Sequence, residues 1–470
     1  MTYEQKHRQP FWINDALKWE VDTPPIQLTK NITVDVCIIG GGYTGLWTAI
    51  QLKQQKPEMG VVIIEKNLCG DGASGRNGGC MLTWSAKYSS MVRLYGLEEA
   101  KRLVIASEQA LFKIRDFCLA NKIDAEIRLD GALFGSTNEA QLGNMDSVIK
   151  KLKQDGINSW EYWQKDKAQL AAGSARHLEG YHSPIGGSLH PGLLVRGLRK
   201  VAINMGVEIF ENTPMTTLAE TSPAIISTPN ARITAKKIVL ALNAWMPKNF
   251  PKFNNKIILV SSDMAITEPI PKLLQEIGIK DGKSILDSRT FVNYYHSTIS
   301  GRLMLGKGGN MFAFNNIIHP AFDKKSRYEP QLRNTMDWLF PKLKNVSIAT
   351  TWTGPSDRSA TGLPFFGHLN GNNDIVYGLG YSGNGVGQTY VGGQFLSAMV
   401  LDLDNEWTNS TMAKGPLGSF PPEPIRWLGA MTVRNAIRRK EKAEDLNKSP
   451  NWVDMQLAKI ANSAGKSDKN

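Results

Sequence analysis

The stretch Val34–Gly45, VDVCIIGGGYTG, decides the fold of this chain. Its first six residues form a β-branched run suited to a strand buried on both faces, and a glycine-rich turn follows without a gap. Apolar residues then recur at helical spacing from Leu46 to about Lys56. A second apolar run, VVII at 61–64, ends in the carboxylate of Glu65. The order strand, turn, helix, strand and acid predicts a βαβ unit.

This unit has the glycine pattern of a dinucleotide-binding turn. Gly40 permits the tight turn, Gly42 lets the backbone approach a diphosphate, and Gly45 lets the helix pack closely on the strand. The helix N-terminus offers N–H groups to the diphosphate, and Glu65 can bind ribose hydroxyls. The alternative is a purely structural glycine turn. We expect the cofactor contacts of this unit to be Gly40, Gly42, Tyr43, Thr44, Gly45, Glu65 and Lys66.

A second glycine-dense loop, GDGASGRNGG at 70–79, indicates FAD rather than NAD. An NAD dehydrogenase needs no second backbone cradle directly after the ribose-binding acid, whereas a flavin extends beyond the diphosphate. A charge such as Arg76 near the ring can tune its electronics. A flexible surface loop is the alternative. The expected contacts in this loop are Gly72, Ser74, Arg76, Asn77, Gly78 and Gly79.

A third glycine cluster, VYGLGYSGNGVG at 376–387, leads from an expected strand into a helix over about 388–401. A helix N-terminus suits polar atoms such as the pyrimidine edge of a flavin. Alone, this segment could be a structural connection, but three glycine clusters favour one discontinuous flavin-binding domain. Its expected contacts are Gly383, Asn384, Gly385 and Val386.

From about Val34 to Leu401 the chain resembles the glycine/D-amino-acid-oxidase-like superfamily of FAD-dependent amine oxidoreductases, through these three segments. The resemblance implies further cofactor contacts at Met215, Ala241 and Asn243. Longer blocks, among them FWINDALKWE at 11–20 and the tail sequence PPEPIRWLGAMTVRNAIRRKEKAED, look like putative aminophosphonate oxidoreductases, a group near γ-glutamylputrescine oxidases. The narrower likeness rests on these blocks and on no motif that reads phosphonate.

The expected fold is therefore α/β (α+β overall). It combines a discontinuous Rossmann-like FAD-binding domain with a second, mostly antiparallel β-sheet domain for the substrate and a C-terminal helical tail. We assign residues 30–100, 185–245 and 346–414 to the FAD-binding domain. Residues 101–184 and 246–345 form the substrate-binding domain, and 415–470 the tail. A length of 470 residues agrees with more than one domain.

Composition excludes several classes of protein. The chain carries 55 Lys and Arg against 43 Asp and Glu, a net charge of +12, but no long basic block, so we expect no nucleic-acid partner. Four cysteines without a CxxC pair and seven histidines without HExxH predict a reduced protein with no metal site. No run of eighteen apolar residues and no signal peptide are present, which predicts a cytoplasmic protein without a membrane partner. The oligomeric state is left open.

In amine oxidation a hydride leaves the carbon beside a neutral nitrogen, so no catalytic triad is required. Lys307 is the candidate catalytic residue, because a buried cation can assist dioxygen reduction or bind an anion. For Lys307, and for each of the substrate-binding candidates named below, the alternative is a purely structural residue, either exposed on the surface or packed in the core. No cysteine follows Cys118, so the cysteine linkage that some relatives make near 351–357 is impossible and FAD should be non-covalent. Substrate-binding candidates are Arg302, His296, Tyr295, Arg358 and Tyr381, with Tyr294 and Trp84 as further aromatic candidates.

The leading functional hypothesis is oxidation of a small anionic amine, such as 2-aminoethylphosphonate or its N-methyl derivative, to an imine that hydrolyses to an aldehyde. Electrons then pass to dioxygen or another acceptor. An alternative keeps the chemistry with γ-glutamylputrescine or an amino acid such as glycine or sarcosine. More distant alternatives are a tRNA-modifying flavoprotein and a protein that binds FAD only structurally.

Overall fold

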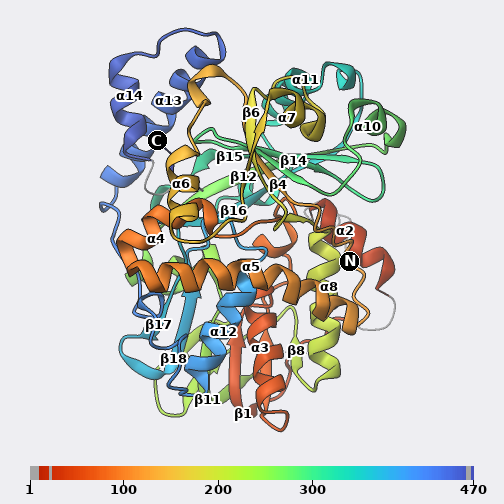
Figure 1. The fold of residues 1–470 in the computed structure, drawn as a ribbon. Coiled ribbons are helices and arrows are strands. Elements are labelled where there is room, and N and C mark those ends of the chain that lie inside the picture. The colour runs from red at the N-terminus through yellow and green to blue at the C-terminus, as the bar shows by residue number, and fades with distance from the viewer. Residues whose placement is uncertain (1–9, 21–23, 462–466, 470) are drawn as a thin grey trace.

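The computed structural model describes residues 10–20, 24–461 and 467–469, and two eight-stranded sheets form its framework (Figure 1). The first sheet fills the lower half of the view and the second lies above it, with the tail helices at the upper left. This is the α/β arrangement expected from the sequence, with a parallel nucleotide sheet, a mostly antiparallel second sheet and C-terminal helices.

The first sheet has the strand order β17-β18-β11-β1-β2-β8, with the hairpin β9–β10 attached to β11. The pairs β18–β11, β11–β1, β1–β2 and β2–β8 are parallel, so their carboxyl ends meet at one edge. The strands are β1 (Ile32–Ile39), β2 (Val61–Ile64), β8 (Glu208–Phe210), β9 (Thr217–Ala219), β10 (Ala224–Ser227), β11 (Arg232–Leu240), β17 (Phe365–Leu369) and β18 (Asn372–Leu379).

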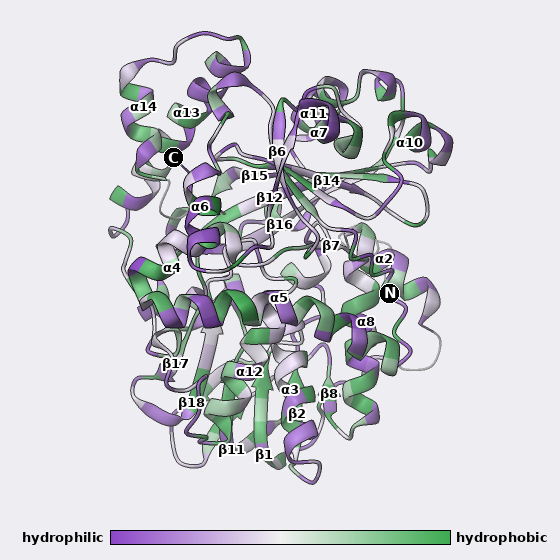
Figure 2. Ribbon diagram, viewed as in Figure 1, coloured by the Kyte–Doolittle hydropathy of each residue, from purple (hydrophilic) through white to green (hydrophobic). Residues whose placement is uncertain are grey.

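Side chains alternate between the two faces of this sheet, and both faces are covered by other parts of the chain. Val36 and Ile38 belong to the large apolar core on the face that α3, α5 and α12 cover. Cys37 and Ile39 point to the opposite face and pack with the hairpin β9–β10 and with Phe253. The continuous apolar run VCII thus fits a central parallel strand, and Figure 2 shows this region in green.

The second sheet has the order β16-β12-β15-β14-β13-β4-β6-β5, and all its pairs are antiparallel except β13–β4. Its strands are β4 (Ala132–Ser136), β5 (Glu161–Gln164), β6 (Glu179–Ser183), β12 (Ile257–Thr267), β13 (Ser284–Asp287), β14 (Asn293–Ser297), β15 (Leu303–Phe312) and β16 (Ile348–Ser359). A short two-stranded ladder, β3 (Cys80–Met81) with β7 (Gly187–Ser188), lies apart from both sheets.

The strand β16 belongs to the second sheet, although the range 346–414 was assigned to the FAD-binding domain. Its ladder with β12 runs from Ile348 to Ser359, so the second sheet extends to Ser359. Sequence alone gave no break there, because β16 leads into β17 of the first sheet after a short turn. We propose a domain boundary near residue 360.

The helices surround the two sheets and form the tail. They are α2 (Phe11–Ala16), α3 (Tyr43–Gln55), α4 (Tyr88–Tyr95), α5 (Leu97–Ala120), α6 (Asp146–Gln154), α7 (Lys165–Ala172), α8 (Pro191–Asn204), α9 (Met246–Asn249), α10 (Pro271–Ile277), α11 (Glu329–Leu339), α12 (Gln388–Val400), α13 (Ile425–Asp445) and α14 (Trp452–Lys459). Among the described residues, none of these helices combines the length and apolar character that crossing a bilayer requires.

The tail packs on the body as helices rather than extending from it. Arg434 and Arg438 of α13 donate to the backbone and side-chain oxygens of Asn310 on β15, at 2.9 Å each. Arg439 pairs with Asp454 of α14 at 2.6 Å. These three arginines of the tail therefore have partners within the chain.

Candidate active site

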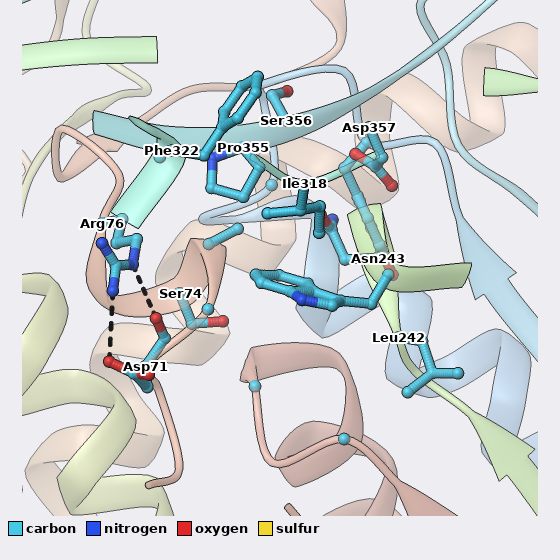
Figure 3. Close-up of a pocket in the computed structure, with 18 of the residues that line it drawn as sticks. Asp71, Ser74, Arg76, Leu242, Asn243, Ile318, Phe322, Pro355, Ser356 and Asp357 are labelled. Atoms are coloured by element: carbon cyan, nitrogen blue, oxygen red, sulfur yellow. Dashed lines mark hydrogen bonds and ion pairs between the residues drawn. The ribbon is translucent and has the colours of Figure 1, made fainter. Parts of the chain in front are cut away.

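A cavity of about 1050 Å³ opens between the carboxyl edge of the first sheet and one face of the second. One side is formed by the turn after β1, the end of β2 with the loop that follows it, and the loop after β11, and the other by β12, β13, β14 and β16. Figure 3 shows part of both sides, with Ser74, Arg76 and Asn243 on the first and Pro355 and Ser356 of β16 on the second. We call the first side the nucleotide wall and the second the sheet wall. The three glycine segments, far apart in the sequence, all line it.

The turn between β1 and α3 requires its glycines. Gly40 has a φ of +116°, and a Cβ there would lie 2.5 Å from the carbonyl oxygen of Ala241. A Cβ on Gly45 would lie 2.0 Å from the carbonyl oxygen of Gly40. Gly42 is the N-cap of α3 and provides no side-chain cap, while the N–H of Tyr43 donates to Ser74 Oγ at 2.8 Å. The helix thus presents backbone donors to the cavity, as a diphosphate needs.

Glu65 lies at the carboxyl end of β2 and holds two loops. Its Oε2 accepts the N–H of Gly41 at 2.9 Å, and its Oε1 accepts the N–H of Asn67 at 3.0 Å. Burial raises the pKa of Glu65 above its usual value, and the two backbone donors oppose that rise. Each carboxylate oxygen keeps a further lone pair, so Glu65 can also accept ribose hydroxyls.

The second glycine loop is held by its own side chains. Asn77 donates to the carbonyl oxygen of Ser74 at 2.7 Å, and its Oδ1 accepts the N–H of Gly79 at 2.8 Å. Arg76 is 3% exposed and pairs with Asp71 at 3.4 Å and with Asp323 at 2.6 Å. The guanidinium therefore joins this loop to the segment between β15 and α11.

The third glycine segment closes the cavity near the start of α12. Thr44 donates its hydroxyl to Tyr381 Oη at 3.1 Å, which ties this segment to α3. The Asp357 carboxylate accepts the N–H of Gly380, and burial raises the pKa of Asp357 to about 6. Gly383, Gly385 and Tyr381 line the cavity.

Most residues predicted to bind the cofactor line this one cavity, and three do not. Gly45 packs against the turn, Gly79 lies beneath it against the carbonyl oxygen of Leu189, and Asn384 donates to the carbonyl oxygen of Thr83 at 3.2 Å. Those that line it are Gly40, Gly42, Tyr43, Thr44, Glu65, Lys66, Gly72, Ser74, Arg76, Asn77, Gly78, Met215, Ala241, Asn243, Gly383, Gly385 and Val386. Their contacts with a cofactor remain a prediction.

Lys307 does not line the cavity. It lies on β15 beside Gly306, whose Cβ position faces the ring of Tyr294. Successive side chains on a strand point to opposite faces, so Lys307 points away from the cavity. Its Nζ donates to the carbonyl oxygen of Phe291 at 3.0 Å and to Asn293 Oδ1 at 2.9 Å, and burial lowers its pKa.

The same alternation separates the two tyrosines of β14. Tyr294 lines the cavity, and its hydroxyl lies 2.8 Å from Ser262 Oγ. Tyr295, the residue predicted from sequence, points to the opposite core, where its hydroxyl donates to the carbonyl oxygen of Ala172 at 2.8 Å. Adjacent aromatic residues in a strand give no sequence signal that tells which one faces a ligand.

The basic residues predicted to bind an anionic substrate lie outside the lining of the cavity. Arg302 donates to the carbonyl oxygen of Thr267 at 2.8 Å and pairs with Glu268 at 3.1 Å. His296 is buried behind the second glycine loop, with its Nε2 2.8 Å from the carbonyl oxygen of Gly78, and burial lowers its pKa to about 4. The backbones of Arg358 and Tyr381 pair in an isolated antiparallel β-bridge, and burial lowers the pKa of Arg358 to about 10.

The sequence did not predict one segment that lines the cavity in addition to the nucleotide wall and the sheet wall. Residues 315–320 and 322–324, between β15 and α11, line it although they contain no glycine or other motif. Ser262 and Leu286 of the second sheet also line it. Period-two alternation indicates which residues share a sheet face, but it does not tell which face meets the cavity. Among the described residues, no group of three or more His, Cys, Asp or Glu side chains is placed to hold a metal ion.

The residues present fit FAD. The turn at Gly40 and Gly45 is too tight for any Cβ, Gly42 places no capping side chain at the start of α3, and Glu65 ends the second strand. Residues 35–399 match the family described as FAD dependent oxidoreductase (DAO), and this chain belongs to that family. It is thus a flavin-dependent oxidoreductase of the amine and amino acid oxidase type.

Two curated relatives are similar to this chain over most of its length, and one solved structure shares its fold. The chain is 27% identical to the probable oxidoreductase OrdL of Haemophilus influenzae, over 85% of this chain and 90% of that protein. It is 28% identical to the γ-glutamylputrescine oxidoreductase of Escherichia coli, over 84% and 89% respectively. The crystal structure of glycine oxidase from Geobacillus kaustophilus shares the fold, with a TM-score of 0.66 and 18% identity over 80% of this chain and 96% of that one.

Proposed function

We propose that this protein oxidises the C–N bond of a small anionic amine in the cavity between the two sheets. The observation that carries the proposal is that one continuous cavity has the nucleotide wall on one side and the sheet wall, with Tyr294 and Ser262, on the other. Bound FAD would supply the two-electron acceptor for this chemistry. A substrate on the sheet wall would lie between the cofactor and the second sheet.

The chain's own residues would bind and orient the amine. Gly40, Gly42 and the start of α3 would hold the diphosphate, and Glu65 the ribose. On the sheet wall, Leu286 provides an apolar surface that excludes water, and the paired hydroxyls of Tyr294 and Ser262 provide a polar contact. Burial raises the pKa of Tyr294, so its hydroxyl stays protonated; it donates to Met264 Sδ at 3.3 Å, and a rotation of the hydroxyl would let it donate to the substrate.

For the substrate we propose an aminophosphonate, 2-aminoethylphosphonate or its N-methyl derivative, with an aldehyde as the product after imine hydrolysis. The long tail and N-terminal sequence blocks support this choice. The cations that line the cavity are Lys66, Arg76, Lys248 and Lys324, and a phosphonate would have to be placed near one of them. The E. coli relative's name favours a second candidate, γ-glutamylputrescine.

The test is an anaerobic titration of the yellow, FAD-loaded protein with a panel of amines, followed by exposure to air. The panel contains the two aminophosphonates, γ-glutamylputrescine, glycine and sarcosine. We expect rapid bleaching at the lowest concentration with an aminophosphonate, and the return of colour in air if dioxygen is the acceptor. Equal or faster bleaching with γ-glutamylputrescine or the amino acids would overturn the aminophosphonate proposal. A protein that binds FAD but bleaches with none of them would overturn amine oxidation.

We also propose that FAD is held without a covalent bond. Cys80 lines the cavity, and it is the residue to substitute as a control. Acid precipitation should leave all the flavin in the supernatant, both for the unchanged protein and for Cys80→Ser. Flavin that stays with the precipitate of the unchanged protein would contradict this proposal, and its loss in Cys80→Ser would locate the bond.

A further inference from the structure

The segment 313–325, which joins β15 to α11, crosses the cavity from the second sheet toward the nucleotide wall. We call it the strap. It contains two short 3-10 turns, Phe314–Asn316 and Pro320–Asp323, and residues 315–320 and 322–324 line the cavity. Apart from Lys324, one of the four cations named above that line the cavity, no residue of the strap has a role in the glycine segments or in the proposed chemistry.

The strap is fixed at its start. The side chain of Asn316 donates to the carbonyl oxygens of Asn254 at 2.9 Å and Ile257 at 3.1 Å. Its Oδ1 accepts the N–H of Leu259 at 2.9 Å. This residue is 3% exposed, so one buried amide joins the strap to the first residues of β12.

The far end of the strap is held by an ion pair with the second glycine loop. Asp323 lies 2.6 Å from Arg76, and the two side chains are 48% and 3% exposed. Phe322, beside it, is buried in a small apolar cluster with Ala244 and Leu259, and Ile318 packs against the same cluster. Figure 3 shows Phe322, Ile318 and Arg76 around one opening. The strap therefore reaches the nucleotide wall at two places.

The two attachments of the strap differ in how strongly they hold it. Asn316 makes three hydrogen bonds in the interior, whereas the carboxylate of Asp323 is half exposed to water, which weakens an ion pair. The Phe322 cluster contains few residues, and small satellite clusters open at low free energy. Opening the strap at its Asp323 end therefore requires breaking one half-exposed ion pair and exposing Phe322, while the Asn316 end stays attached.

We propose that the strap is a gate for the cofactor, which must open for FAD to enter or leave, and that the Arg76–Asp323 ion pair holds it closed. This inference rests on the proposed binding of FAD in the cavity. If the closed strap blocks passage in both directions, loosening it speeds entry and release by the same factor and leaves the affinity unchanged. A side chain that only contacts bound FAD would change release and affinity but not entry.

The experiment compares Asp323→Asn with Asp454→Asn, which breaks an ion pair of the same 2.6 Å length in the tail. Association and dissociation rates of FAD are measured by flavin fluorescence with purified cofactor-free protein. We expect both rates to rise about tenfold in Asp323→Asn, which corresponds to about 1.4 kcal/mol, with the dissociation constant within about threefold of the parent. Asp454→Asn should change neither rate.

Two results would overturn the gate: unchanged rates in Asp323→Asn, or a faster release without faster entry. A readout without FAD separates this failure from a failure of FAD binding itself. Lys324 and Lys325 are exposed on the strap, and trypsin should cut there several-fold faster in cofactor-free Asp323→Asn than in Asp454→Asn. Equal cleavage would also count against the gate, whether or not the protein binds FAD.

Discussion

At the scale of single residues, burial decides the charge state of Asp357, which anchors the third glycine segment. Its pKa is raised from 3.8 to about 6 by burial, although the N–H of Gly380 stabilises the ionised form. The native state therefore binds more protons than the unfolded chain between about pH 4 and pH 6. Stability from this residue is present at low pH and is lost as pH rises through that window.

This sign gives a prediction for Asp357→Asn, which removes the titration but keeps an acceptor oxygen. Relative to this variant, the parent protein should lose about 2.4 kcal/mol of unfolding free energy between pH 4 and pH 7.5, since each pKa unit is worth about 1.4 kcal/mol and the unfolded carboxyl is already partly ionised at pH 4. Urea unfolding of both proteins at the two pH values, with FAD at fixed excess, measures the difference. A difference that does not depend on pH would contradict the assignment.

At the scale of the element, strand alternation decides which side chains of β14 meet the cavity. Tyr294 and Tyr295 have the same chemistry and adjacent positions, but they point to opposite faces of the second sheet. The first touches Ser262 in the cavity wall, and the second lies in a core with Ala172 behind the sheet. The two hydroxyls should therefore have separable effects.

Tyr294→Phe should raise KM for the best amine of the panel about three- to tenfold, because it removes a hydroxyl from the sheet wall. Tyr295→Phe should leave KM unchanged and lower the unfolding free energy by about 1–2 kcal/mol, because it removes the buried hydroxyl that bonds to the carbonyl oxygen of Ala172 and to His177 Nε2. Steady-state kinetics and urea unfolding of both variants, with flavin content as the common check, test this. A raised KM in Tyr295→Phe and a loss of stability alone in Tyr294→Phe would contradict this placement of the two side chains.

At the scale of the whole molecule, the tail completes a buried ionic cluster on the face of the second sheet opposite the cavity. Glu441 of α13 is 8% exposed, and its Oε1 accepts the N–H of Phe291 at 3.2 Å. Burial raises the pKa of Glu441, while Lys307 and Arg289 attract its charge and oppose that rise. Arg289 also pairs with Asp445 at 2.6 Å. Lys307, which faces away from the cavity, is thus a partner of the tail.

Glu441→Ala should lower the unfolding free energy by about 3–5 kcal/mol, because it leaves buried cations without one of their counter-charges. Flavin absorbance should be retained, since the cluster lies on the face of β15 opposite the cavity. Lys442→Ala, at the exposed next position, is the matched control and should change stability by less than about 0.5 kcal/mol. Loss of flavin in Glu441→Ala without loss of stability would contradict this role.

The sequence by itself determined the nucleotide half of the protein. VDVCII, the Gly40–Gly45 turn and Glu65 specify a βαβ unit through local chemistry, since a buried strand, a turn that excludes Cβ atoms and a helix N-terminus are each encoded within a few residues. The family resemblance and the three glycine segments led to the same cavity that the structure shows.

Only the tertiary structure decided what faces the cofactor from the second sheet. Lys307, Tyr295, Arg302 and His296 carry suitable chemistry, but strand parity and partners elsewhere in the fold keep them out of the cavity lining. The strap enters the cavity through contacts more than sixty residues away in sequence, such as Asn316 with Asn254 and, farther still, Asp323 with Arg76. Such contacts depend on how the two sheets pack against each other, and this packing cannot be predicted from a local pattern of residue types.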